Sequence, residues 1–525
     1  MNSNLKLLSA LIDLDGANPM LAKIAATIDL SETKTDKSLP NKIKFPGSIL
    51  WIGYGIVSRC TLPLISEHLD FDWKKVTIVD KEDKKKELKA FIDKGATFVL
   101  EEVTEESYEK QFKKYVGKKG DMIVDLAYNI GVIDIVTWCH ENEVFYFNTS
   151  VEEWDPYQYK TIYEKTLYNR HMKLRKAIKS WSETSTTAIL DHGANPGIIS
   201  HLTKKGLLDL AKAILNDTKV LPSQVDKQKV RKAIKDGAFN ELAMHLGVKT
   251  IHDSERDTQI SLNPKRVNEF VGTWSIEGLR EEGTLCSEIG WGTHEIKVPE
   301  FAQTPSEGPK HQIFLAQMGI NTLVRSFVPG DGEIVGMAIR HGESLTIPEA
   351  LTVYNDKGKA IYRPTFHYAY MPCDGTVASL LELKARNYEI QDETRPLFDD
   401  IISGDDCLGA LIMGHPYNSW YCGSRVNINE SRKIVPGQNA TSLQVAAGVI
   451  SGIMWMIQNP NEGVCFPDNL PCEEILEFAK PYLGEVISER CDWTPFTNYK
   501  PAFEENEDMR LDAKNPWCFQ NFIFK

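Results

Sequence analysis

Short apolar runs recur along the first third of the chain, separated by longer stretches whose apolar residues follow helical spacing. The runs have the length of strands. The strands predicted in this way are residues 49–53, 76–80, 97–100, 122–126, 144–147 and 187–191. Strands that alternate with helices of this length predict a parallel, doubly wound sheet of the α/β class.

Longer stretches predict helices. Residues 62–65 belong to a helix after the first strand, residues 81–94 form a charged amphipathic pattern, and residues 157–181 form a long helical one. The apolar run 445–457 follows a favourable helix start at Asn439. Because a bilayer-spanning helix needs about 20 apolar residues, we expect a buried core helix here and no membrane partner.

The pattern changes after Gly193. A charged insert spans residues 226–236, and residues 351–362 read as two strands joined by a turn at 355–358. These hairpin-like segments predict a mixed α/β second domain with antiparallel strands.

Composition and charge narrow the class of protein. A hydrophobic fraction of 42% and a charged fraction of 25% are typical of globular proteins, and 525 residues are too many for one compact core. The 73 acidic and 60 basic residues give a formal net charge of −13. This sign argues against a nucleic-acid partner and favours a cationic ligand, although acidic charge alone can simply keep a large protein in solution.

The cysteines and the N-terminus indicate the compartment. The ten cysteines form no CxxC pair and no Cys/His cluster at zinc spacing, so we expect reduced thiols and no metal. The first residues carry one lysine, and Asp13 interrupts their apolar run, which makes a poor signal peptide. We therefore expect a cytoplasmic protein.

A glycine-containing turn follows the first predicted strand. In dinucleotide-binding turns of the form G-x-G-x-x-G, the first glycine makes the turn, the second admits the pyrophosphate and the third allows close packing. Gly53 and Gly55 occupy the first two positions, and Ser58 occupies the third. Serine is small enough to keep the packing role, and the phosphates would bind backbone N–H groups at the helix N-terminus.

Asp80 ends the second predicted strand. An acid at this place accepts hydrogen bonds from the adenosine ribose and favours NAD over NADP, although the adjacent Lys81 would soften repulsion of a 2′-phosphate. Two glycines in a turn are common by chance, but strand, turn, helix, strand and acid occur here in the required order. This order favours dinucleotide binding over a purely structural turn.

These observations divide the chain into three expected parts. They are an N-terminal extension, residues 1–45; an NAD-binding Rossmann-like domain, residues 46–193; and the mixed α/β domain, residues 194–525, to which the resemblance described below assigns substrate binding, catalysis and dimerisation. The last part of the third can pack back on the second.

The segment Asp191–Gly197 precedes a predicted helix at 198–215. Pro196 suits a first helical turn, and Asn195 could cap that helix. Alternatively, Asn195 lies at the mouth of the cofactor cleft.

Four segments in the second half combine acids with tryptophans and glycines, namely residues 255–258, 272–277, 281–283 and 290–295. Exposed acids alone are usually solvated surface. Interleaved with indoles, they suggest a pocket for a cation, because carboxylates neutralise ammonium groups and indoles offer a π face.

The whole set of motifs resembles bacterial-type homospermidine synthase, within the saccharopine-dehydrogenase-like superfamily. The segments that carry the resemblance are IGYGIVSR, TLPLI, GANPG, ERDTQ, GTWSIEG, GWGTHE, YRPTFHYAY, QNATSLQV and DWTP, in family order from about Ile49 to Pro516. The resemblance implies a cytosolic homodimer that keeps NAD as a recycled prosthetic group. It also implies that two putrescines, or putrescine and spermidine, are joined by oxidation, imine exchange and reduction, with release of ammonia.

The resemblance also implies the site residues. Around the substrate it places Asn195, Glu255, Trp274, Glu282, His341 and Asp406, with Glu152 near the cleft. Around the cofactor it places Gly53, Gly55, Ile56, Val57, Ser58, Asp80, Asn129, Thr149 and Asn195. Two positions depart from the family pattern: Ser58 replaces a common glycine, and Asn129 stands where an aspartate is possible.

Several of these residues have simpler interpretations. Glu255 could pair with Arg256, His341 could be a structural histidine, and Asp406 could cap a helix. Glu282 could be an ordinary loop acid.

Two other classes of function stay open. A saccharopine-type dehydrogenase would consume NADH at every turnover and needs arginines converging on an α-amino carboxylate. A non-catalytic NAD-sensing protein would bind the dinucleotide without amine chemistry.

Overall fold

The computed structural model describes residues 42–182, 184–501 and 510–524. Most of the expected N-terminal extension, residues 1–45, lies outside the described residues. Its last part contributes β1 (Ile43–Lys44), which pairs in parallel with β3 (Leu69–Asp70).

The N-terminal part forms a parallel sheet of seven strands, as predicted. The strands are β2 (Ile49–Ile52), β4 (Val76–Asp80), β5 (Thr97–Leu100), β6 (Met122–Asp125), β7 (Phe145–Asn148), β8 (Ala188–Ile189) and β24 (Val464–Cys465). Their order is β24-β8-β7-β6-β2-β4-β5. The six strands β2, β4, β5, β6, β7 and β8 thus follow the doubly wound arrangement, in which the order reverses between β2 and β6. β24 comes from the C-terminal half and pairs with β8.

The helices of this part are α3 (Ile56–His68), α4 (Lys89–Ile92), α5 (Tyr108–Tyr115), α6 (Val132–Glu141) and α7 (Leu167–Ile178). The predicted helix at 81–94 is wrong except for α4. The side chains of Asp80 and Asp83 accept hydrogen bonds from backbone N–H groups two residues on, and such turns compete with a helix.

The predicted helix at 157–181 is also shorter in the structure. The hydroxyl of Thr166 accepts a hydrogen bond from Asn169 N and caps α7, so that the helix begins at Leu167. A short 3₁₀ turn, Tyr163–Lys165, precedes it.

The second half is built on a large mixed sheet, as predicted. Its strands are β9 (Thr250–Asp257), β12 (Cys286–Gly290), β13 (Ala302–Gln303), β14 (Gln312–Met318), β15 (Leu323–Val328), β16 (Gly332–Met337), β19 (Thr365–Met371), β22 (Asp405–Met413), β23 (Ser419–Asn427) and β25 (Glu485–Arg490). Most pairs are antiparallel, but β9 and β19 are parallel. The predicted hairpin at 351–362 is present as β17 (Val353–Tyr354) and β18 (Ala360–Tyr362).

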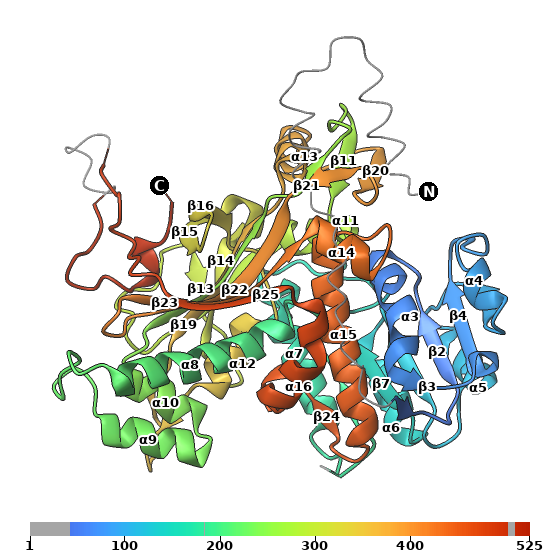
Figure 1. Cartoon of the computed structure of the whole chain (residues 1–525), viewed down its shortest axis with the longest axis horizontal. Coiled ribbons are helices and arrows are strands. Elements are labelled where there is room, and N and C mark those ends of the chain that lie inside the picture. The colour runs from blue at the N-terminus through green and yellow to red at the C-terminus, as the bar shows by residue number, and fades with distance from the viewer. Residues whose placement is uncertain (1–41, 183, 502–509, 525) are drawn as a thin grey trace, which may run out of the picture. The chain divides into compact units, whose positions relative to one another are not determined.

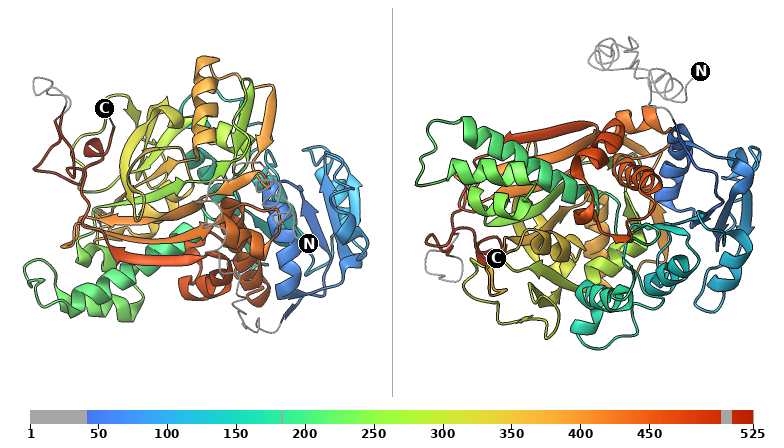
Figure 2. Two further views of the ribbon diagram at one scale, coloured as in Figure 1. Left: turned by 45° about the horizontal axis from the view of Figure 1, so that its top comes forward. Right: turned by 90° about the horizontal axis from the view of Figure 1, so that it is seen from below.

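Helices cover this sheet and join it to the first one. They are α8 (Ile198–Asn216), α9 (Lys227–Asp236), α10 (Phe239–Leu246), α11 (Ile276–Thr284), α12 (Glu343–Ala350), α13 (Asp374–Ala385), α14 (Ile428–Ile434), α15 (Ala440–Gln458) and α16 (Cys472–Ala479). The green helix α8 packs on β22 and β23 of the large sheet, and α9 and α10 pack on α8 (Figures 1 and 2).

The helix predicted from the run 445–457 is α15. It packs against α3, and one buried apolar cluster contains Trp51, Ile65, Ile450 and Met454 (Figure 1). Its 19 residues are long and apolar enough to cross a membrane, but 89% of its apolar window is buried inside the protein. Burial rather than length therefore identifies α15 as a core helix.

Candidate active site

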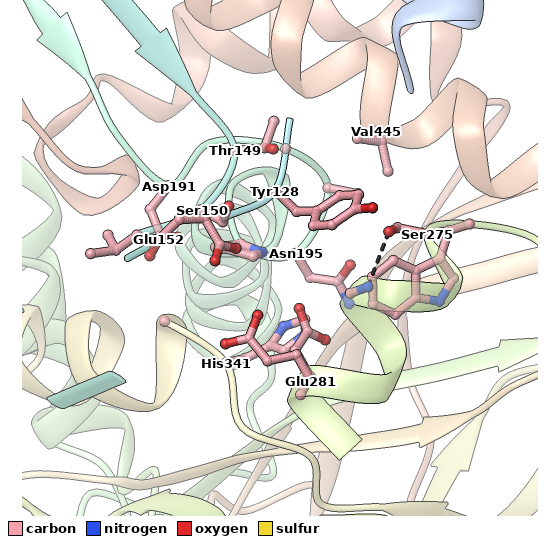
Figure 3. A pocket seen from close by; sticks show the side chains of 18 of the residues that line it. Tyr128, Thr149, Ser150, Glu152, Asp191, Asn195, Ser275, Glu281, His341 and Val445 are labelled. Carbon is pink, nitrogen blue, oxygen red and sulfur yellow. Dashed lines mark hydrogen bonds and ion pairs between the residues drawn. The ribbon is translucent and has the colours of Figure 1, made fainter. Parts of the chain in front are cut away.

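A pocket opens at the carboxyl edge of the N-terminal sheet, where α/β proteins of this type bind ligands. Its first wall comes from α3 and from the loops after β6, β7 and β8, and its second wall comes from β9, α11, β19 and the loop before α12. The side chains from the first part that line it include Val57, Tyr128, Thr149, Glu152, Arg170, Asp191 and Asn195. Those from the second part include Glu255, Trp274, Glu281, Glu282, Arg340, His341, Tyr368 and Thr441. Figure 3 shows Thr149, Asn195, Glu281 and His341 around one space.

The glycine turn lies at one end of this pocket. Gly53 has φ +83°, a conformation that favours glycine, and an added Cβ would come within 3.2 Å of Ala127. A Cβ on Gly55 would meet no atom within 4 Å, so the space above the turn is open. No side chain caps α3 at Gly55, which leaves N–H groups of its first turn for an anion.

Ser58 is fully buried. Its hydroxyl donates a hydrogen bond to Gly53 O at 2.6 Å and accepts one from Trp51 Nε1 at 2.9 Å. The serine therefore does more than fill the space of a small residue, because it joins the turn to the preceding strand.

Asp80 lies beside the turn, at the end of β4. Its carboxylate accepts hydrogen bonds from Tyr54 N at 2.6 Å and from Glu82 N at 2.8 Å. The Lys81 side chain does not pair with Asp80. Its ammonium group lies 5.1 Å from the centre of the Tyr128 ring and 3.9 Å from Glu102.

The predicted cofactor residues divide into two groups. Val57, Thr149 and Asn195 line the pocket. Gly53, Gly55, Ile56, Ser58, Asp80 and Asn129 do not line it and belong to the turn, to the start of α3 and to the ends of β4 and β6. Asn129 has φ +59°, a conformation that asparagine tolerates better than most residues.

Asn195 connects two acids of β9. Its side-chain amide donates to Asp253 Oδ2 at 3.0 Å and to Glu255 Oε2 at 2.9 Å. The N-cap residue of α8 is Gly197, so Asn195 does not cap that helix. Glu255 also accepts a hydrogen bond from the hydroxyl of Tyr368. Burial raises the pKa of Glu255 to about 7.

His341 lies between two carboxylates. Its Nε2 is 3.0 Å from Glu282 Oε2, and its Nδ1 is 3.4 Å from Glu343 Oε2. Burial by itself would lower the pKa of His341, but Glu282 and Glu343 outweigh it and raise this pKa well above the usual value. The two carboxylates therefore favour the charged form of the histidine.

Two arginines also reach the pocket, and both are already paired. Glu281 Oε1 is 2.6 Å from the guanidinium of Arg170 and 2.5 Å from that of Arg340. Arg170 also lies 3.6 Å from Glu152, whose pKa burial and the charge of Glu281 raise to about 7. A substrate carboxylate would have to displace these partners to bind an arginine.

Trp274 lines the pocket and is partly exposed. Its indole nitrogen donates a hydrogen bond to the hydroxyl of Tyr370 at 2.9 Å. This bond and the packing of the ring on the cluster around Ile276 and Leu279 fix the orientation of the indole.

Asp406 lies behind the pocket rather than in it. It belongs to strand β22, so it caps no helix, and it stands opposite Asp257 in the ladder with β9. It accepts a hydrogen bond from the hydroxyl of Thr441, which does line the pocket. Burial, with the charges of Glu255 and Asp257, raises the pKa of Asp406 well above its usual value.

The sequence analysis named Glu281 only within the acidic segment 281–283, and it missed other residues of this site, namely Arg170, Asp253, Arg340, Glu343 and Tyr368. One of them had a readable signal. In the segment His252–Asp257 an acid occurs at every second position. Side chains two residues apart in a strand share a face, so Asp253, Glu255 and Asp257 lie on one face of β9. Arg340 and Glu343 lie within two residues of the predicted His341 but carry no signal of their own, whereas Arg170 and Tyr368 come from distant elements.

The doubly wound sheet, the glycine turn and the pocket against a mixed second domain are the features of a two-domain dinucleotide-binding protein. Residues 49–189 match the family "Saccharopine dehydrogenase NADP binding domain", and residues 193–491 match "Saccharopine dehydrogenase C-terminal domain". The chain is 36% identical to the homospermidine synthase of Blastochloris viridis, over 92% of this chain and 98% of the relative. It is 34% identical to that of Mesorhizobium japonicum, over 91% and 96%. The chain belongs to the homospermidine synthase family.

A solved structure supports this assignment. The homospermidine synthase of Legionella pneumophila, in complex with NAD, is 35% identical and superposes with a TM-score of 0.81 over 92% of this chain and 99% of that one.

Proposed function

We propose that the protein is a homospermidine synthase, which joins two putrescines, or putrescine and spermidine, through a bound NAD. For two putrescines the products are homospermidine and ammonia, and no net oxidation occurs. The observation that carries this proposal is the group of acids in the pocket at the carboxyl edge of the N-terminal sheet. Glu255 lines it without a cationic partner among the described residues and Glu282 faces only His341, whereas both arginines are neutralised by Glu281 and its neighbours.

The residues present fit NAD. The open space over Gly55, the uncapped start of α3 and the carboxylate of Asp80 suit a pyrophosphate and an adenosine ribose with a free 2′-hydroxyl. When bound, NAD would supply the hydride chemistry, namely oxidation of the amine-bearing carbon of the first putrescine and reduction of the imine formed with the second. Val57, Thr149 and Asn195 would hold its nicotinamide end beside the acids.

The protein's own residues supply charge and orientation. Glu255 would pair with a substrate ammonium group, and Asn195 holds its carboxylate in place. Trp274 would present its ring face to the same cation or to the iminium. His341, charged between two acids, is placed to donate a proton to departing ammonia, and Glu282 to accept one from the attacking amine. Glu152 and Asp406 would contribute to the negative charge around the pocket.

We also propose a homodimer in the cytoplasm. The buried α15 gives no support to a membrane location, and the polyamine substrates are small soluble cations.

The test is incubation with putrescine and substoichiometric NAD, followed by amine chromatography and absorbance of NADH. The proposal expects many homospermidines per NAD and no net NADH. A yield of one product per NAD would favour a saccharopine-type dehydrogenase. Tight NAD binding without any new amine would favour an NAD-sensing protein. NADP in place of NAD is the matched control and should support little turnover.

A further inference from the structure

Glu343 is a buried carboxylate that the function proposed above leaves without a role. The residue is 0% exposed, and neither carboxylate oxygen has a hydrogen-bond partner among the described residues. Its one ion pair in the described chain is to His341 Nδ1, at 3.4 Å. A buried carboxylate without donors is costly, so burial raises the pKa of Glu343, and its ionised form requires a compensating positive charge.

The local backbone brings this acid and the histidine together. Arg340, His341 and Gly342 lead into α12, which begins at Glu343. A Cβ on Gly342 would lie 2.0 Å from Asp191 Oδ2, so this loop fits against Asp191 only with glycine at that position. Glu343 is thus fixed in the first turn of α12, where the helix dipole also favours a negative charge.

We propose that Glu343 is a positioning residue that holds His341 as an imidazolium and aims its Nε2 proton at Glu282 and the pocket. The carboxylate lies behind the ring, on the Nδ1 side, while Glu282 lies on the Nε2 side. When both carboxylates are ionised, each can only accept a hydrogen bond, so the proposal requires a proton on both ring nitrogens. Glu343 does not line the pocket, so it acts through His341 and does not touch substrate. The kinetic part of this proposal rests on the proposed function, whereas the state of His341 does not.

Other charged groups also face His341. From the neighbouring elements these are Glu282 of α11, Asp253 and Glu255 of β9, Tyr368 of β19, Asp191 after β8 and Arg340 beside it in the chain. Asp253 Oδ1 also lacks a partner and lies within reach of the same histidine and of Glu343. A divalent cation held by Asp253, His341 and Glu343 is the rival explanation for these bare oxygens.

The experiment is ¹⁵N NMR of the full-length protein with labelled histidine, titrated from about pH 5 to 9. The His341 signals are assigned by their loss in His341→Gln. The proposal expects both ring nitrogens of His341 protonated at pH 7 in the wild type. In Glu343→Gln its pKa should fall by about 1 to 3, because one of two neighbouring charges is removed. Glu349→Gln is the matched control, since Glu349 lies on the same helix and pairs with Arg175 instead.

Several outcomes would overturn the proposal. A neutral His341 at pH 7 in the wild type does so even if Glu343→Gln fails to fold, and an unchanged titration in Glu343→Gln does so as well. If the protein contains stoichiometric metal and the His341 signals shift when a chelator removes it, His341 is a metal ligand and not an imidazolium. Glu343→Asp keeps the negative charge, so the pKa of His341 in this variant should stay close to that of the wild type.

Kinetics give a separate readout. In Glu343→Gln, kcat for homospermidine should fall about tenfold or more at pH 8, with KM for putrescine nearly unchanged and much of the rate recovered at pH 6. An equal loss at both pH values would mean that Glu343 is merely structural. If the wild type forms no homospermidine, the proposed function fails, and the NMR titration still decides the role of Glu343.

Discussion

The indole nitrogen of Trp51 donates a hydrogen bond to the hydroxyl of Ser58, which in turn donates to the carbonyl of Gly53. Trp51 and Ser58 are both buried. The residue that replaces a common glycine therefore satisfies a buried donor in this chain, and it fastens the cofactor turn to the strand before it.

The first prediction concerns this bond. Ser58→Ala should lower the free energy of unfolding by about 1–3 kcal/mol, because it leaves the Trp51 N–H buried and unpaired. Ser58→Gly should do the same and should not tighten NAD binding. Chemical denaturation and NAD titration measure both effects. Trp51→Phe removes the N–H, so Ser58→Ala should cost much less stability in the Trp51→Phe background than in the wild type. Equal losses in the two backgrounds would contradict this explanation.

The second prediction concerns cofactor choice. Asp80→Ala should weaken NAD by about one to two decades, since a hydrogen bond to a charged group is worth about 1.5–3 kcal/mol. Discrimination against NADP should weaken as well. Asp83→Ala is the control, because Asp83 makes a similar local turn away from the glycines. Unaltered NAD affinity in Asp80→Ala would remove this acid from the cofactor site.

The third prediction concerns Trp274. A desolvated cation–π contact is worth about 2 kcal/mol, and phenylalanine keeps only part of it. Trp274→Phe should therefore lower kcat/KM for putrescine about tenfold while NAD binding survives, and Trp274→Ala should be worse. Trp493→Phe also removes an indole hydrogen bond, to Glu333, but outside the pocket. It should lower Tm without changing activity per folded molecule. The same behaviour in Trp274→Phe would make Trp274 a core residue.

The fourth prediction concerns pH. Burial raises the pKa of Glu255 and of Glu152 to about 7, from an ordinary value of 4.5. The folded protein therefore binds more protons than the unfolded chain between these values, and its free energy of unfolding should decline as pH rises from about 4.5 through 7. A bound diammonium neutralises these carboxylates and releases their protons. Putrescine affinity should hence rise with pH, by up to about tenfold per pH unit for each proton released.

Calorimetry in two buffers of different ionisation enthalpy measures that proton release. The rise in Tm with putrescine should be larger at pH 8 than at pH 6. Glu255→Gln should weaken putrescine binding, cut turnover and reduce proton uptake or release on binding. Glu282→Gln should cut turnover as well. Binding that is independent of pH would mean that neither acid meets the ammonium groups.

The sheet of the N-terminal part could be predicted because each strand is a continuous apolar run with a helix between it and the next. The helix at 81–94 could not, because side chains such as Asp80 and Asp83 bind the local backbone and compete with helical bonds. Periodicity counts apolar spacing and does not register that competition.

Only part of the candidate site could be predicted from the sequence. Asp253 shares an alternating strand with Glu255, and its role follows from period two once the strand is recognised. Tyr368 becomes a neighbour of Glu255 only when β19 pairs with β9, whereas Glu343 lies two residues from His341 and is placed by the start of α12. Asp406 was predicted at the substrate, yet it reaches the pocket only through Thr441, a contact between a strand and α15 that no short motif encodes.

The short strand β24 means that the N-terminal sheet cannot be completed by the N-terminal part of the chain alone. It completes the edge of the N-terminal sheet beside β8, and α15 covers α3, although both come from beyond residue 439. A fragment ending near residue 193 would expose the open edge of β8 and the apolar side of α3 to other chains. Gene fusions, truncations and domain exchanges that cut at that point should therefore yield aggregates, whereas coexpressed halves should associate and recover the enzyme.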